Sequence, residues 1–167
     1  MVDLTVIRDL VAIASFIIAL SYYVLNIRNQ REARKIQLIR ELNEFFIEGH
    51  SNRHYYQMMD MEWDNFDDFN SKYGFEANPD FYDEWVRIWR NMNYYGLLIK
   101  DGLTNASTYV QYIGDGTPIF WGKFKPIIEE MRILSDDPEM YIGIEILSRE
   151  VNKYRVSKGL KPKGQSK

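Results

Sequence analysis

Residues 10–27 read LVAIASFIIALSYYVLNI, a run of 18 positions without a charged side chain. At a rise of about 1.5 Å per residue, this run forms a helix of about 27 Å, close to the thickness of the hydrocarbon core of a bilayer. The rest of the 167-residue chain is polar and charged, and it has the length of one domain. The sequence therefore predicts a transmembrane helix over residues 10–27 that carries one soluble domain.

The flanks of this run indicate a retained anchor rather than a cleaved signal peptide. Asp3, Arg8 and Asp9 precede it, whereas a signal peptide begins with basic residues. Residues 28–40 hold five basic side chains and one acidic side chain, a net charge of +4. The positive-inside rule then places the domain in the cytoplasm and residues 1–9 outside the cell membrane. A removed signal peptide and a buried core helix are the alternatives.

The basic segment after the run, residues 28–47, is predicted to be a juxtamembrane helix. Arg28, Arg31, Arg34 and Lys35 are expected to contact lipid headgroups, since anionic lipid attracts each such residue by about 1 kcal/mol. No Gly or Pro lies between Leu10 and Gly49, so anchor and juxtamembrane segment are expected to form one helical rod.

The soluble part, residues 48–158, is predicted to be an all-α bundle of about five helices, because no long stretch alternates with period two. Asn78-Pro79, Thr117-Pro118 and Asp137-Pro138 each place Pro after a capping residue, which is typical of a helix start. Shorter helices are expected after Asp64 or Asn65 and after Thr104 or Asn105. Pro126 should kink or split the helix that contains it.

Apolar side chains at helical spacing predict the core of this bundle. One stripe is Phe81, Trp85, Ile88, Trp89, Met92 and Tyr95; the other is Tyr141, Ile144, Leu147, Val151 and Tyr154. Trp63, Phe66 and Phe69 lie within an acidic segment, and we expect them to point inward while their acidic neighbours point outward.

Charge is distributed unevenly along the chain. Residues 60–84 carry a net charge of −8, and residues 153–167 carry +6. The acidic middle argues against nucleic acid as a partner. The basic tail, residues 159–167, is expected to be flexible and solvated, with docking on the membrane or on the acidic segment as alternatives.

Residues 90–102 read RNMNYYGLLIKDG, and Ile119-Phe120-Trp121 and Pro126-Ile127-Ile128 follow. These motifs resemble a family of short prokaryotic single-pass membrane-anchored helical domains of unknown function. The resemblance covers most of residues 10–155. It implies an anchor plus a helical domain, and it supplies no catalytic residues.

The search for chemistry finds one metal candidate. His50 and His54 are four residues apart, which places both on one face of a helix, and Asp60 could join them. Gly49 and Ser51 argue against a helix there, and the chain holds no Cys. We therefore predict no catalytic residue, no metal and no cofactor.

A stripe of small or polar residues runs along the predicted anchor: Ala12, Ser15, Ala19, Tyr22 and Asn26. Small residues let membrane helices approach closely, and polar side chains bond between them. This face is expected to pack against another membrane helix, either a second copy or a partner subunit.

Together these features predict a membrane-tethered, non-enzymatic protein-interaction module or an accessory subunit of a membrane complex. One alternative is a membrane-bound metal-dependent enzyme or effector that uses His50, His54 and the acidic region. A further alternative is a helical domain that senses a ligand or lipid.

Overall fold

The computed structural model describes residues 4–43 and 51–164, and in this part helices joined by turns and loops are present and no strand is. The all-α prediction is confirmed. The chain divides into two compact units between Glu41 and Leu42, which are described separately.

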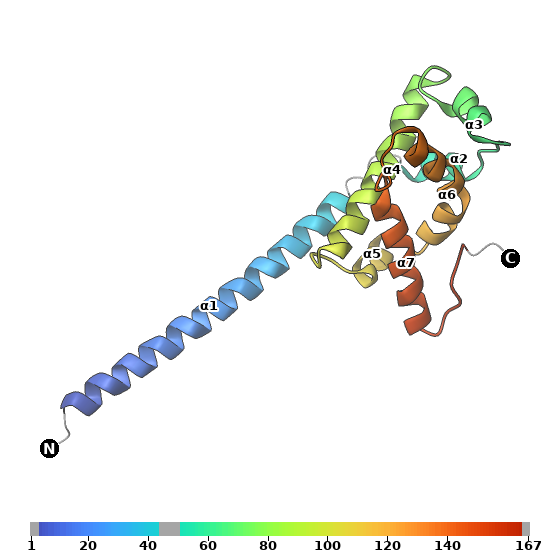
Figure 1. The fold of residues 1–167 in the computed structure, drawn as a ribbon. Helices are drawn as coiled ribbons and strands as arrows, with labels where there is room; N and C mark the ends of the chain where they lie inside the picture. The colour runs from blue at the N-terminus through green and yellow to red at the C-terminus, as the bar shows by residue number, and fades with distance from the viewer. Residues whose placement is uncertain (1–3, 44–50, 165–167) are drawn as a thin grey trace. The chain divides into compact units, whose positions relative to one another are not determined.

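The first unit contains all but the last two residues of helix α1 (Leu4–Asn43), a continuous helix of 40 residues (Figure 1). The expected rod is thus confirmed as far as Asn43, and the remainder of the juxtamembrane segment lies outside the described residues. The large apolar side chains from Leu4 to Leu25 are exposed. Within α1, the stretch Leu4–Leu38 is long and apolar enough to cross a membrane, and the rest of the described chain buries none of its apolar window.

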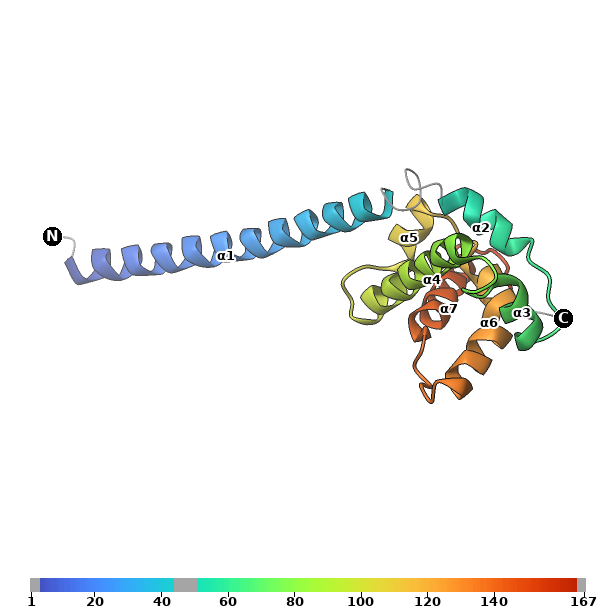
Figure 2. The same ribbon diagram turned by 90° about the horizontal axis from the view of Figure 1, so that it is seen from above.

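The second unit contains six described helices: α2 (Ser51–Met59), α3 (Phe66–Tyr73), α4 (Pro79–Lys100), α5 (Ala106–Tyr112), α6 (Thr117–Leu134) and α7 (Ile142–Ser157). Helices α4 and α7 form the central pair and lie side by side in both views (Figures 1 and 2). Helices α5 and α6 pack on α7, α2 packs on α4, and α3 packs on α6.

Three of these helices begin where local capping signals predict. The side-chain oxygens of Asn65, Asn78 and Asn105 accept hydrogen bonds from the amides of Asp68, Phe81 and Thr108, at 2.9, 3.2 and 2.9 Å. Each bond satisfies an amide that has no partner within its own helix. Helix α4 ends at Lys100, with Asp101 as its C-cap.

The predicted cap of α6 is wrong. The helix begins at Thr117, but its N-cap is Gly116, which has no side chain to form a capping bond. Thr117 is instead buried, and its hydroxyl pairs with Tyr109. Pro126 does not split α6, which continues to Leu134. Because Pro126 has no amide hydrogen, the carbonyl of Gly122, one turn earlier, loses its usual partner. Both residues are exposed, so water can bond to that carbonyl.

The predicted start of α7 is also wrong. Asp137 begins a turn, in which its side chain accepts from the amide of Glu139 at 3.0 Å, and the helix starts only at Ile142. A tertiary contact lies at this start: the amide of Gly143 donates to the Asn93 side chain of α4 at 2.8 Å.

Both predicted apolar stripes lie in the core. Trp85, Ile88, Trp89, Ile144 and Leu147 are at most 2% exposed, and they pack with Phe120 and Phe124 of α6. Phe69 is buried, and Trp63 and Phe66 pack against the same core, while Asp64 and Asp67 are exposed. The inward orientation of these aromatic residues is therefore confirmed.

The chain after α7 turns back along the domain as far as Gly164. Asn152 exchanges two hydrogen bonds with the backbone of Lys163, at 2.9 and 3.0 Å. The Lys163 ammonium lies 2.6 Å from Asp115, which also pairs with Arg155 of α7. Lys163 thus docks on Asp115 rather than on the acidic segment of residues 60–84.

Candidate interaction cleft

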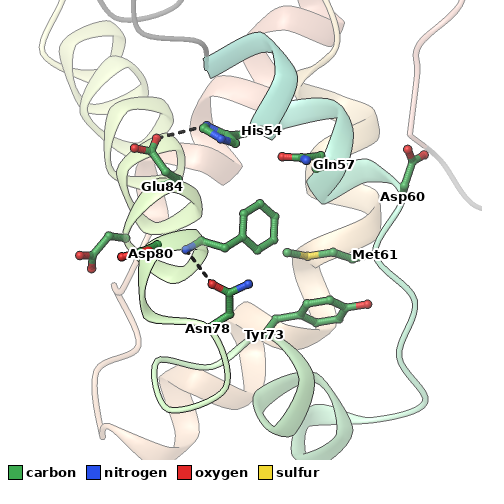
Figure 3. Close-up of a pocket in the computed structure, with 10 residues that line it drawn as sticks. His54, Gln57, Asp60, Met61, Tyr73, Asn78, Asp80 and Glu84 are labelled. Carbon is green, nitrogen blue, oxygen red and sulfur yellow. Dashed lines mark hydrogen bonds and ion pairs between the residues drawn. The ribbon is translucent and has the colours of Figure 1, made fainter.

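Helices α2, α3 and the start of α4 surround an open cleft of about 810 Å³ (Figure 3). We call it the acidic cleft. Ten residues line it: His54, Gln57, Asp60, Met61, Tyr73, Asn78, Asp80, Phe81, Asp83 and Glu84.

Local sequence explains how α4 contributes to this cleft. Asn78 caps the helix and Pro79 occupies its first turn, which fixes the start of α4 at the edge of the cleft. The first two turns then supply Asp80, Phe81 and Glu84 to the lining. An acidic residue in the first turn is also favoured by the positive end of the helix dipole.

A histidine and a glutamate face each other across the cleft, from α2 and α4 (Figure 3). His54 Nδ1 lies 3.3 Å from Glu84 Oε2, and the same oxygen accepts from Arg87 at 2.5 Å. The His54 ring also meets the ring of Phe81 edge-on, at 6.2 Å between centroids. These contacts join α2 to α4.

The opposite end of α2 is held by Lys123 of α6. Its ammonium donates to the carbonyls of Met59 and Met61 at 2.7 and 2.5 Å, and it lies 5.1 Å from the centre of the Trp63 ring. The last carbonyls of a helix lack partners within it, and a cation there also complements the helix dipole. Burial lowers the pKa of Lys123. This residue therefore fixes the wall of the cleft that α2 provides.

The cleft combines negative charge with apolar surface. Asp60, Asp80 and Asp83 are exposed and form no ion pair within residues 4–43 and 51–164. Met61, only 4% exposed, and the half-buried Phe81 supply the apolar part of the lining. Such a surface suits a ligand with a positive charge on an apolar stem, as in Lys and Arg side chains.

The metal candidates are brought together only in part. His54 and Asp60 line the same cleft, and His50 lies outside the described residues. Among the described residues, no group of three or more His, Asp or Glu side chains is arranged to hold a metal ion. The contacts of Glu84 with His54 and of Lys123 with Met59 were not predicted. Each joins residues far apart in the sequence, by 30 and 64 positions, so no local pattern indicates it.

The predicted membrane residues all lie on α1. Ala12, Ser15, Ala19, Tyr22 and Asn26 are exposed, as are Arg28, Arg31 and Arg34, while the side chain of Lys35 lies outside the described ones. The hydroxyl of Ser15 donates to the carbonyl of Val11 at 2.8 Å, within the same helix. Helix packing and lipid contact stay predictions.

Comparison with known proteins supports the family assignment and supplies no activity. No curated protein and no solved structure gives a significant match to the chain. Residues 9–151 match the family described as Domain of unknown function (DUF4760), a match that runs from the apolar helix to the middle of α7. The chain therefore belongs to the DUF4760 family of domains of unknown function.

Proposed function

We propose that this protein is a membrane-tethered, non-enzymatic interaction module, or an accessory subunit of a membrane complex. Helix α1 crosses the cell membrane, with residues 1–9 outside and the helical domain in the cytoplasm. The observation that carries the proposal is the apolar surface of α1, which is exposed from Leu10 to Leu25 without a charged side chain. Each Å² of such surface costs about 25 cal/mol in water, and a bilayer removes that cost.

The charges on α1 support the orientation. Arg28, Arg31, Arg34 and Arg40 are exposed and follow the apolar stretch. Basic residues in this position are retained on the cytoplasmic side and attract anionic lipid headgroups.

The acidic cleft supports the interaction role. Its carboxylates on α4, Asp80 and Asp83, have no ion pair among the described residues, and they stand beside the apolar side chains of Met61 and Phe81. We therefore assign the cleft to a cationic segment of a partner protein. Electrostatic attraction of this kind contributes to specificity and to the rate of association.

The tether and its orientation can be tested with single cysteines, because the chain holds none. Leu4→Cys should react with a membrane-impermeant maleimide in intact cells, and Gln111→Cys should react only after lysis. Both variants should remain in the membrane fraction after carbonate extraction. Recovery in the soluble fraction, or the reverse labelling pattern, would contradict the proposal.

The interaction can be tested by photo-crosslinking in cells. A photoreactive residue at Gln57, in the acidic cleft, should capture one protein partner, whereas the same residue at Gln111, outside the cleft, should not. The crosslink should disappear in Asp80→Lys/Asp83→Lys and persist in Asp67→Lys/Glu139→Lys. The second variant makes the same change in net charge away from the cleft. Equal crosslinking in both variants would exclude the cleft as the docking site.

A further inference from the structure

A second, smaller cavity of about 260 Å³ lies among α2, α4, α5 and the start of α6. Its lining consists of Tyr55 and Tyr56 of α2, Met92 of α4, Tyr109 of α5, and residues 113–117. None of these residues lines the acidic cleft. The wall thus combines aromatic and apolar side chains with polar atoms at Tyr55, Tyr109 and residues 114–117, where the Tyr55 hydroxyl donates to the Gly116 carbonyl at 3.5 Å.

Two buried hydroxyl groups meet at this wall. Tyr109 is 1% exposed and Thr117 is 2% exposed, and their hydroxyl oxygens are 3.0 Å apart. The pair carries two hydrogens, and the bond between the two oxygens uses one of them. Neither hydroxyl has another hydrogen-bond partner in the part of the chain that the structure describes. Burial raises the pKa of Tyr109, so its phenol remains protonated at neutral pH. An aliphatic hydroxyl such as that of Thr117 does not ionise there. One buried donor thus lacks an acceptor, an arrangement that costs free energy unless a bound molecule supplies one.

The start of α6 brings the positive end of its helix dipole to the same cavity. Gly116, its N-cap, lines the cavity and has no side-chain oxygen to cap the first turn. The N-terminal end of a helix carries partial positive charge, which favours an oxygen acceptor nearby.

Charge at the wall selects against an anionic ligand. Asp115 lines the cavity, and its carboxylate pairs with Arg155 and, at 2.6 Å, with Lys163. Neither of these cations lines the cavity itself. A ligand carboxylate would therefore be repelled by the Asp115 carboxylate, and no free cation at the wall would offset this repulsion. A neutral acceptor avoids the repulsion.

We propose that this cavity binds a small, neutral aromatic molecule whose carbonyl oxygen accepts the free hydrogen of the Tyr109–Thr117 hydroxyl pair. The volume fits this class, since a dry cavity of about 150 Å³ holds benzene and drug-sized ligands occupy about 300–1,000 Å³. The site is independent of the acidic cleft and of the membrane tether.

The test uses the full chain in phospholipid nanodiscs, with ¹³C-labelled methyl groups on Met and Ile. Benzamide serves as the carbonyl probe, toluene as the apolar control and benzoate as the anionic control. Benzamide should shift the methyl resonances of Met92 and Ile113 in a saturable manner and leave Met140, which does not line the cavity, unchanged. Benzoate should bind more weakly than benzamide.

The hydroxyl pair is tested by Tyr109→Phe/Thr117→Val, because either single substitution leaves one free hydroxyl hydrogen. The double variant should lose about 3- to 10-fold in benzamide affinity and keep its toluene affinity. Ser148→Ala, which removes a buried hydroxyl outside the cavity, should bind benzamide as the unmodified protein does. Absent saturation at Met92 and Ile113, tighter binding of benzoate, or an unchanged benzamide affinity in the double variant would each overturn the proposal. Any of these results would mean that ordered water alone occupies the cavity. The proposed membrane tether does not depend on this outcome.

Discussion

Gly96 of α4 and Gly143 of α7 bring the backbones of the two central helices into direct contact. A Cβ atom on Gly96 would lie 1.7 Å from the carbonyl oxygen of Gly143, and one on Gly143 would lie 2.0 Å from the carbonyl oxygen of Asn93. The Asn93 side chain accepts from the Gly143 amide at 2.8 Å in the same place. This crossing therefore fixes the position of α7 on α4 at the centre of the domain.

Gly96→Ala should accordingly destabilise the helical domain. The added methyl group would meet backbone atoms, which cannot move aside as a flexible side chain can, so the two helices must separate. We expect a loss of about 1–3 kcal/mol, typical of overpacking in a core. Urea unfolding followed by circular dichroism measures it. Gln111→Ala, on the exposed surface of α5, should change the free energy of unfolding by less than about 0.5 kcal/mol.

Asp115→Asn should release the chain that follows α7. The carboxylate holds Arg155 and Lys163, and its loss leaves two cations without this partner. We expect a local loss of about 1 kcal/mol, since these charges are partly exposed to solvent. Hydrogen exchange of the Lys163 amide, which donates to Asn152 at 2.9 Å, should become faster. Asp101→Asn serves as the control, because Asp101 forms no ion pair in residues 4–43 and 51–164. Equal exchange in both variants would show that the Asp115 ion pairs do not hold the segment.

Local signals in the sequence predicted much of this fold. Asn65, Asn78 and Asn105 cap their helices because the bonded amide lies only three residues away. Apolar spacing identified the core of α4 and α7, since helical periodicity determines which side chains share a face. The start of α7 was missed because a contact with Asn93, 50 residues earlier, accompanies it.

The candidate site was less accessible to this reasoning. His54 and Asp60 could be singled out from residue type and spacing, and both line the acidic cleft. Which other carboxylates join them depends on how α2 packs against α4, and no local pattern encodes that arrangement. The same holds for the Tyr109–Thr117 pair, because a cap–Pro pattern assigns the Thr117 hydroxyl to its own helix rather than to the core.

Asp68→Asn should flatten the acid side of the pH–stability curve. The hydrogen bond from Lys72 at 2.7 Å lowers the pKa of Asp68 below its ordinary value of 3.8. A carboxylate with a lowered pKa in the folded state stabilises that state above the unfolded pKa, and the contribution is lost as the pH falls through the folded pKa. Unfolding from pH 7 to pH 2 should therefore show a smaller loss of stability in the variant. Asp67→Asn, which removes a neighbouring exposed carboxylate without this bond, should follow the unmodified protein, and identical curves for all three proteins would contradict the prediction.

Ala19→Leu/Asn26→Leu should weaken association through α1. The Ser15 hydroxyl already bonds within its helix, whereas the side-chain amide of Asn26 has no hydrogen-bond partner in the described chain. In lipid, a partner helix can satisfy that amide, and polar bonds between membrane helices contribute about 0.6–2 kcal/mol. A leucine at position 19 would also keep the backbones apart. Fluorescence energy transfer between labelled copies in nanodiscs, together with recovery of partners in mild detergent, should decrease. Ala14→Leu/Ser21→Leu makes a comparable small-to-large change off the stripe and should leave both measurements unchanged; an equal decrease would mean that added bulk, rather than this face, governs the association.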